Sequence, residues 1–222
     1  MILYNKMAIV KTVIVLPDSS DDKGQNKGKL AFVLSGVLDV DYCNHLIRMT
    51  EDKQYTPAVI NTGSEHVIDT SIRNNSRYMT HDSDITNYIF DKIKEFIPVT
   101  FNGRKLVGIY DKMRYLKYRP GEYFKPHYDG ITELDHGRVS MLTVQLYLND
   151  NFTGGTTRFL SDNFDTIVDT TIDTTIDTTG EQFVDVIPQT GSVLIFEHEI
   201  LHEGCILLSG TKYTVRMDIL YK

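Results

Sequence analysis

Residues 188–204 read PQTGSVLIFEHEILHEG, a short apolar run followed at once by two histidines and a glycine. The run GSVLIF has the length of a buried strand, and only one residue separates it from the first histidine. From residue 108 onward, similar apolar runs are separated by Gly, Pro, Asn and Asp, which punctuate strands. They lie at about 108–118, 122–129, 138–148, 156–160, 183–187, 191–197, 201–207 and 211–221. This spacing predicts a β-sandwich or barrel in the second half of the chain.

The first half of the chain adds two strands and two helices. Residues 7–17 are rich in Ile and Val and residues 30–34 are apolar, so we expect a strand in each. Asp39 can cap a helix whose apolar face consists of Cys43, Leu46, Ile47 and Thr50. A second helix is predicted over about 82–97, and Pro98 ends it. Its apolar stripe consists of Ile85, Tyr88, Ile89, Ile93 and Phe96. Residues 54–80 are polar and are expected to be irregular.

We therefore predict one domain over residues 1–222 that is mainly β with N-terminal helices (α+β). Residues 1–107 supply strands and supporting helices, and residues 108–222 form the β core. An acidic insertion interrupts this core at 161–182, where D-T-T-I recurs every four residues. Seven of the 30 acidic residues lie between Leu160 and Asp185, without any Lys or Arg. A period of four suits neither a strand nor a helix face, so we predict a surface loop there.

Composition limits the classes of partner. The chain is 41% hydrophobic and 24% charged, as in ordinary globular proteins, and its net charge is −7. That charge disfavours a nucleic-acid partner bound through its phosphates. No apolar run approaches the ~18 residues of a membrane span, and Lys11 interrupts the apolar N-terminal stretch, which no cleavage site follows. With only two cysteines and no disulfide framework, we expect an intracellular, cytoplasmic protein without membrane association. Its oligomeric state stays open.

The tripeptide HYD at 127–129 is the first candidate for chemistry. On a strand, alternate side chains share a face, so His127 and Asp129 would point the same way as two adjacent ligands of a divalent metal. This pattern also arises often by chance. A hydrogen-bonded surface pair is therefore the alternative interpretation.

The pentapeptide HEILH at 198–202 matches the H-E-x-x-H pattern of zinc peptidases. That pattern binds zinc only on a helix, where histidines four residues apart share a face. Here a predicted strand precedes His198 and Gly204 follows closely, and no glutamate follows Glu203 to act as a third ligand. A zinc peptidase therefore remains only as an alternative.

A third interpretation joins the first two. His127, Asp129 and one later histidine would place two imidazoles and one carboxylate on one side of a metal. This facial arrangement is typical of non-haem Fe(II) oxygenases, because it leaves three positions open for substrate and oxygen. His202 lies 75 residues after His127, which is enough chain to wind a small double-stranded β-helix and return.

Five pieces of sequence, in order, carry a resemblance to a known family. They are YDKMRYLKYRPGEYFKPHYD (110–129), LTVQLYLND (142–150), GGTTRFL (154–160), PQTGSVLIFEHEILHEG (188–204) and GTKYTVRMDILY (210–221). Together they resemble the catalytic domain of the Fe(II)/2-oxoglutarate dioxygenases, most of all the prolyl 4-hydroxylase-type branch, over about half the chain. The resemblance implies a double-stranded β-helix (jelly-roll) core. It also implies Fe(II), with 2-oxoglutarate and O2 as co-substrates, and it allows ascorbate as a further cofactor.

Carried over by position, the resemblance makes His127, Asp129 and His202 the catalytic iron ligands, and it gives His198 no ligand role. Lys212, ten residues after His202, would hold the distal carboxylate of 2-oxoglutarate. Arg216 could replace or assist Lys212, because alternation places both side chains on one face of a strand.

Further pocket residues follow from the same resemblance. Tyr118 and Thr157 would supply hydroxyl groups to the distal carboxylate of 2-oxoglutarate, since a buried carboxylate needs donors to replace its lost hydration. Gln145 is expected to line the site as well. Arg138 lies near the position of a substrate-groove arginine, but two residues farther from Tyr147 than expected, which weakens the case for proline. The segment 62–78 stands where the family closes a lid over a peptide, and a merely solvated loop is the alternative.

The resemblance thus implies hydroxylation of a peptidyl side chain, with proline favoured, coupled to decarboxylation of 2-oxoglutarate to succinate. A peptide or protein substrate is the expected partner. Alternatives are the same chemistry on a lysyl, asparaginyl or small-molecule substrate, the zinc peptidase, and a non-catalytic β-helix module that binds a ligand. The sequence also leaves open whether Lys212 or Arg216 holds the carboxylate.

Overall fold

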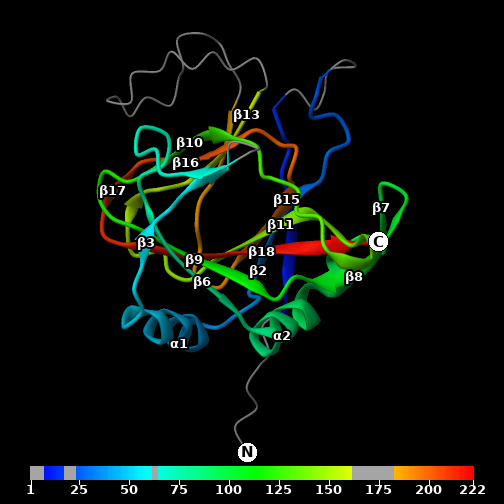
Figure 1. The fold of residues 1–222 in the computed structure, drawn as a ribbon, viewed down its shortest axis with the longest axis horizontal. Coiled ribbons are helices and arrows are strands. Elements are labelled where there is room, and N and C mark those ends of the chain that lie inside the picture. The colour runs from blue at the N-terminus through cyan, green and yellow to red at the C-terminus, as the bar shows by residue number, and fades with distance from the viewer. Residues whose placement is uncertain (1–7, 18–23, 62–64, 162–182) are drawn as a thin grey trace, which may run out of the picture.

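The computed structural model describes residues 8–17, 24–61, 65–161 and 183–222. The predicted acidic insertion therefore lies, from residue 162 onward, outside the described residues. Among them, strands predominate over helices, as predicted (Figure 1). Two helices and two short 3-10 turns complete the structure: α1 (Val40–Glu51), α2 (Ser83–Ile93), η1 (Lys94–Phe96) and η2 (Asp135–Gly137).

A ten-stranded antiparallel sheet forms the middle of the molecule. Its main path runs β1-β2-β15-β11-β18-β9-β6-β3, while β8 pairs with the distal part of β18 and β7 pairs with β8. In that order the strands are β1 (Val10–Val13), β2 (Ala31–Ser35), β15 (Val193–Glu197), β11 (Val139–Tyr147), β18 (Lys212–Tyr221), β9 (Lys112–Tyr118), β6 (Ser76–His81), β3 (Thr56–Pro57), β8 (Arg104–Ile109) and β7 (Thr100–Phe101). Segments distant in the sequence are thus neighbours in the sheet.

A second, four-stranded sheet has the order β10-β16-β13-β14. Its strands are β10 (Phe124–His127), β16 (His202–Gly204), β13 (Thr157–Leu160) and β14 (Phe183–Val186). Two small ribbons flank the sheets: β12 (Thr153–Gly154) with β17 (Leu207–Ser209), and β4 (Ile60–Asn61) with β5 (His66–Val67). In Figure 1 the small sheet lies on the opposite side of the large sheet from the helices.

Both helices begin at aspartate caps. The side chain of Asp39 accepts a hydrogen bond from the Tyr42 amide, and that of Asp82 accepts one from the Ile85 amide. Each cap satisfies a backbone donor that the first turn leaves unpaired. The last turn before Pro98 is 3-10, because proline cannot continue a helix.

Alternation along the strands gives the large sheet two different faces. On β18, Val215, Met217 and Ile219 belong to the main apolar core together with Leu46 of α1 and Ile89 of α2. The intervening residues of β18 are polar and point toward the small sheet, since neighbouring side chains on a strand face opposite ways. The helices therefore cover an apolar face, and the small sheet covers a face that carries charged groups.

The structure corrects three of the predicted segments. The predicted strand 108–118 is two strands, β8 and β9, which both pair with β18 but with registers that differ by two residues. Tyr110 and Asp111 form the break between them. The predicted strand 201–207 is also divided: β16 belongs to the small sheet, whereas β17 pairs with β12.

The third correction concerns residues 54–80, which are not irregular throughout. They contain β6, which pairs along its whole length with β9 and also with β3. Its sequence, SRYMTH, is polar because it lies near the edge of the sheet. Tyr78 nevertheless packs on Tyr115 of β9, with 6.1 Å between the ring centroids.

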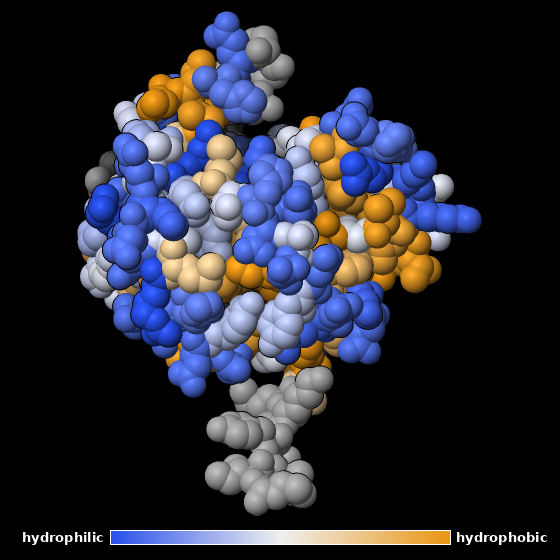
Figure 2. All heavy atoms as spheres, turned by 60° about the horizontal axis from the view of Figure 1, so that its bottom comes forward, coloured by the Kyte–Doolittle hydropathy of each residue, from blue (hydrophilic) through white to orange (hydrophobic). Residues whose placement is uncertain are grey.

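The surface over the helices is largely hydrophilic (Figure 2). Neither helix in the described ranges has the length and apolar character needed to cross a bilayer.

Burial of α1 against the large sheet should contribute measurably to stability. Leu46 is completely buried there. We expect Leu46→Ala to lower the free energy of unfolding by about 2–5 kcal/mol, because it removes buried methyl groups and leaves a cavity. Met49 of the same helix is 41% exposed, so Met49→Ala should change stability by no more than about 0.5 kcal/mol. Urea denaturation measures both, and equal losses would contradict this packing.

Candidate active site

The main pocket lies between the polar face of the large sheet and the small sheet. The large sheet contributes side chains from β6, β9, β11 and β18, and the small sheet contributes them from β10, β13 and β16. The polar lining residues are Arg73, Arg77, Arg114, Tyr118, His127, Asp129, Thr143, Gln145, Thr157, His202, Glu203, Lys212 and Arg216.

Two histidines on neighbouring strands of the small sheet face each other. His127 of β10 is the register partner of His202 of β16, and their ring centroids are 4.3 Å apart. The Nδ1 atom of His127 is 2.8 Å from the Lys125 carbonyl, and that of His202 is 2.9 Å from the Ile200 carbonyl. A carbonyl oxygen only accepts, so Nδ1 carries the proton in both rings. Each Nε2 is then left as a lone pair that can bind a metal.

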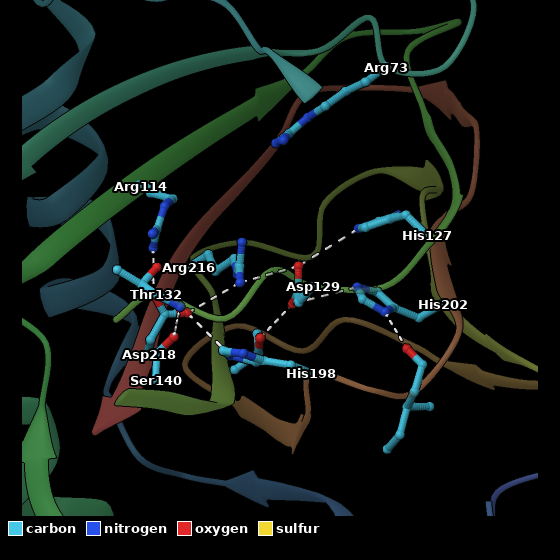
Figure 3. A network of polar contacts seen from close by, with 12 residues as sticks. Arg73, Arg114, His127, Asp129, Thr132, Ser140, His198, His202, Arg216 and Asp218 are labelled. Atoms are coloured by element: carbon cyan, nitrogen blue, oxygen red, sulfur yellow. Dashed lines mark hydrogen bonds and ion pairs between the residues drawn. The ribbon is translucent and has the colours of Figure 1, made fainter. Parts of the chain in front are cut away.

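The carboxylate of Asp129 completes this group. Its oxygens lie 3.9 Å from His127 Nε2 and 3.8 Å from His202 Nε2 (Figure 3). The Thr143 hydroxyl donates to Asp129 Oδ2 at 2.5 Å, and an Arg216 guanidinium nitrogen lies 3.2 Å from Oδ1. The Asp129 amide donates to the His198 carbonyl, so backbone and side chain are both fixed.

The structure thus brings together the three residues predicted as ligands. One ligand atom from each of His127, Asp129 and His202 lies within 4.8 Å of the other two. Burial lowers the pKa of both imidazoles, which keeps them neutral at physiological pH. Burial alone would raise the pKa of Asp129, but the positive charge of Arg216 holds it well below its ordinary value. The group is therefore in the protonation state that metal binding requires.

His198 lies outside this group. It follows β15 in a turn, and its Nε2 is 3.6 Å from Asp218 Oδ1. Residues 198–202 are not helical, so His198 and His202 do not form the paired ligands of a zinc peptidase. This geometry overturns the H-E-x-x-H alternative, because the strand before His198 continues into a turn rather than a helix.

Lys212, at the start of β18, is buried at one end of the pocket. Its ammonium group donates to the Gly155 carbonyl at 2.5 Å and lies 5.2 Å from the centre of the Tyr118 ring. No carboxylate of the described residues lies within 4.0 Å of it. Burial lowers the pKa of Lys212 to about 8. A buried cation without a counter-charge is costly, so this end of the pocket suits an anionic ligand.

Residues that carry hydroxyl groups line the same pocket as Lys212. Tyr118 is its register partner on β9, and Thr157 lines the same pocket from β13. The Thr157 hydroxyl shares a 2.8 Å hydrogen bond with the Tyr147 hydroxyl. Together they offer the combination of one cation and several hydroxyls that an isolated carboxylate group needs.

Arg216 has different neighbours from Lys212, although alternation places both on one face of β18. One of its guanidinium nitrogens lies 3.2 Å from Asp129 and equally far from Asp218. Asp218 also accepts a 2.9 Å hydrogen bond from Arg114 and is almost completely buried (Figure 3). The expectation that Arg216 replaces Lys212 therefore finds no support in its contacts. Arg216 instead connects Asp129 to a buried ion-pair network.

The remaining predicted residues divide into two groups. Gln145 lines the pocket, whereas Arg138 donates to the Asp135 carbonyl and is not part of the lining. Of the segment 62–78, residues 62–64 lie outside the described residues. Residues 70–75 are hydrogen-bonded to residues 121–125, which lead into His127.

Sequence reasoning missed the pocket arginines other than Arg216. Arg73 and Arg77 were considered only as part of the segment 62–78, the possible lid or solvated loop, and Arg114 was given no role. Strand alternation could have identified Arg114, because it places Arg114 on the same face of β9 as Tyr118, which was already predicted to line the site. Arg77 had no such signal, since β6 itself was not predicted.

Comparison with known proteins identifies this arrangement. The family described as the 2OG-Fe(II) oxygenase superfamily matches residues 113–217, which include the triad and Lys212. The match covers slightly less than half of the chain, and over this stretch the chain is similar to the superfamily. The similarity implies Fe(II), 2-oxoglutarate and O2 as the cofactor and co-substrates.

Curated proteins similar to this chain include prolyl 4-hydroxylases. It is 26% identical to probable prolyl 4-hydroxylase 8 of Arabidopsis thaliana, over 83% of this chain and 66% of that protein. It is 23% identical to a putative prolyl 4-hydroxylase of Acanthamoeba polyphaga mimivirus, over 84% of this chain and 72% of that one. The chain thus spans about two thirds of the length of the curated relatives that it matches.

Solved structures share the fold. A viral collagen prolyl hydroxylase from Paramecium Bursaria Chlorella virus-1, in its 2OG complex, aligns with a TM-score of 0.57 at 19% identity, covering 89% of this chain and 99% of that one. A prolyl hydroxylase from Trichoplax adhaerens, in complex with a hypoxia inducible factor peptide fragment, aligns with a TM-score of 0.62 at 14% identity, covering 88% and 85%.

The described residues fit the implied groups. The triad offers two neutral imidazoles and one carboxylate, the donor set that suits non-haem Fe(II) and leaves open positions. The unpaired ammonium of Lys212, with hydroxyls beside it, fits the distal carboxylate of 2-oxoglutarate.

The contact between Arg216 and Asp129 predicts a linkage between metal binding and stability. Asp129 and Asp218 are 5% and 1% exposed, so Arg216→Met should lower the free energy of unfolding of the metal-free protein by roughly 3–5 kcal/mol. Saturating Mn(II) should reduce this loss, because the ion supplies positive charge beside Asp129. Urea denaturation with and without Mn(II) measures both values, with the exposed Arg48→Met as control. An equal loss under both conditions would contradict the linkage.

Proposed function

We propose that this protein is an Fe(II)/2-oxoglutarate-dependent dioxygenase that hydroxylates a peptidyl side chain, with proline the favoured residue, and converts 2-oxoglutarate to succinate. The observation that carries the proposal is the placement of the triad and Lys212 in one pocket. The triad can hold an ion from one side only, and Lys212 can anchor a dicarboxylate that reaches that ion.

In this proposal His127, Asp129 and His202 are the metal ligands. Bound Fe(II) and 2-oxoglutarate supply the oxidising chemistry, in which O2 provides one oxygen atom to a substrate C–H bond and one to succinate. The protein orients these groups. Thr143 and Arg216 fix the Asp129 carboxylate from the side opposite the histidines.

Aromatic side chains keep the histidines oriented and exclude water. Phe124 stacks on His127 with 3.4 Å between the ring centroids, and Phe196 packs edge-on against His202 at 4.7 Å. Lys212, Tyr118 and Thr157 bind the distal carboxylate of 2-oxoglutarate, and Lys212 must be protonated to do so. No protein acid or base is needed to move a proton from the substrate carbon.

The substrate and the domain organisation belong to the same proposal. The names of the curated relatives favour prolyl hydroxylation, and a solved neighbour of the same fold binds a peptide fragment. We propose a double-stranded β-helix core, because two antiparallel sheets face each other across the pocket. Residues 1–222 would form one domain, since β2 and β6 of the first half lie in the same sheet as β11 and β18.

An anaerobic titration with Fe(II) and 2-oxoglutarate tests the metal and co-substrate sites directly. The chelate should give a weak visible charge-transfer band, and admission of O2 with a prolyl peptide should give succinate and hydroxyproline, detected by mass spectrometry. His127→Ala and Asp129→Ala should abolish the band. His198→Gln should largely preserve it, because His198 is not in the triad. Loss of the band in His198→Gln but not in His202→Ala would refute the assignment.

The pKa of Lys212 predicts how co-substrate binding depends on pH. The ammonium is protonated below a pKa of about 8, so 2-oxoglutarate affinity should be constant there. At higher pH the free site must take up a proton to bind the dianion, and affinity should fall by up to tenfold per pH unit. Lys212→Arg stays charged and should remove this dependence between pH 7 and 9.5. Calorimetry with Mn(II)-loaded protein measures the 2-oxoglutarate affinity of the wild type and of Lys212→Arg over this pH range. A wild-type affinity that does not change with pH would argue against Lys212 as the carboxylate-binding residue.

A further inference from the structure

Three arginines from neighbouring strands line one side of the pocket. Arg216 of β18 lies opposite Arg114 of β9 in the register, and Arg77 of β6 lies opposite Leu116. Side chains two residues apart on a strand share a face, so Leu116 and Arg114 point to the same side, and the three arginines do as well. All of them line the pocket, and Arg73 enters it from the segment before β6 (Figure 3).

These arginines give the pocket an excess of positive charge. Five cationic side chains line it against two acidic ones, and the buried Asp218 adds a third acid. The formal excess is therefore two positive charges. Fe(II) and the 2-oxoglutarate dianion carry equal and opposite charges, so loading the proposed groups leaves the excess in place. A third anionic group would reduce it.

The unpaired charge belongs to particular residues. Arg114 and Arg216 have carboxylate partners, whereas Arg73 bonds to the neutral Asn75 side chain at 2.8 Å and lies over the Phe124 ring. Arg77 has no ion-pair partner in the part of the chain that the structure describes.

The Nε atom of Arg77 is also buried without a hydrogen-bond partner among these residues. Burial and the neighbouring Arg114 both lower the pKa of Arg77, which shows that its charge lacks compensation. A guanidinium left in this state is suited to bidentate binding of a carboxylate.

We propose that Arg77, with Arg73 and Arg114 beside it, binds a carboxylate group of the substrate to be hydroxylated. This inference rests on the proposed function and names a feature of its substrate: an anionic group near the reacting carbon. The carboxylate could come from an acidic side chain next to the target residue in a peptide, or from the free carboxylate of a small molecule.

The position of Arg77 separates it from the proposed co-substrate site. Strand β9 lies between β6 and β18, so the backbones of β6 and β18 are two strand spacings, about 10 Å, apart. Lys212 is the register partner of Tyr118, whereas Arg77 is that of Leu116. Arg77 therefore stands at the β6 edge of the pocket, where it can meet a substrate without contacting Lys212.

Binding to a redox-inert complex tests the proposal without turnover. Protein loaded with Zn(II) and 2-oxoglutarate is titrated by calorimetry with two matched pairs of ligands. The first pair is the peptide Ac-Gly-Glu-Pro-Glu-Gly-NH2 and its Gln counterpart, and the second is N-acetylproline and its amide. We expect the charged member of one pair to bind at least about tenfold more tightly, as for a charge-assisted hydrogen bond. The pair that shows this preference identifies the source of the carboxylate.

The matched variants assign the preference to a residue. In Arg77→Gln the ratio of the dissociation constants of the uncharged and the charged ligand should fall to near one. In the exposed Arg48→Gln this ratio should stay at the wild-type value. The proposal is overturned if wild type shows no preference in either pair, if none of the four ligands binds, or if the preference survives in Arg77→Gln. The proposal would also be overturned if Arg77→Gln weakened 2-oxoglutarate binding as much as it weakened binding of the charged ligand, because Arg77 would then serve the co-substrate. The charge-transfer band of the wild type is measured separately, so its absence identifies a failure of the proposed function instead.

Discussion

The carboxylate of Asp129 is the contact on which the rest of the site depends. On one side it faces the imidazoles of two small-sheet strands, and on the other it meets Arg216 and Thr143 of the large sheet. Burial would favour a neutral carboxyl group, and the positive charge of Arg216 keeps it ionised. The two sheets must therefore be held at the correct separation for the triad to exist, which makes the metal site a property of the whole β core.

Alternation in the large sheet allows one layer to serve both stability and binding. The face toward the helices carries aliphatic residues such as Val215 and Met217, and the face toward the small sheet carries Lys212, Arg216 and Asp218. Charged groups on that second face are buried, so each needs a partner or a ligand. Arg114 and Arg216 are balanced by Asp218 and Asp129, while Lys212 lacks a carboxylate among the described residues. This division separates the groups that hold the structure from those available to ligands.

The three side chains that were predicted from the sequence as metal ligands lie together in the structure, and His202 was selected by the family resemblance rather than by a local signal. His127 and Asp129 were predicted to lie on one strand, but β10 ends at His127, and the Asp129 amide is instead held by the His198 carbonyl. The strand before His198 argues against a helical zinc motif. Strand β6 was not predicted, because its polar residues are stabilised by pairing with residues of β9 that lie 31 to 41 positions away in the sequence. The two-residue shift between β8 and β9 is likewise set by pairing with β18.

The sequence by itself determined the mainly β class, the Asp39 cap of α1 and the residue types that could bind a metal, since propensity, periodicity and short spacings act locally. Only the tertiary structure decided that Arg216 supports Asp129 while Lys212 stays unpaired, and that Arg77 enters the same pocket. Lys212 and Arg216 share one strand face and are equivalent by alternation. What distinguishes them is the neighbour that another strand supplies, and such neighbours are fixed by long-range pairing and by the packing of one sheet on the other.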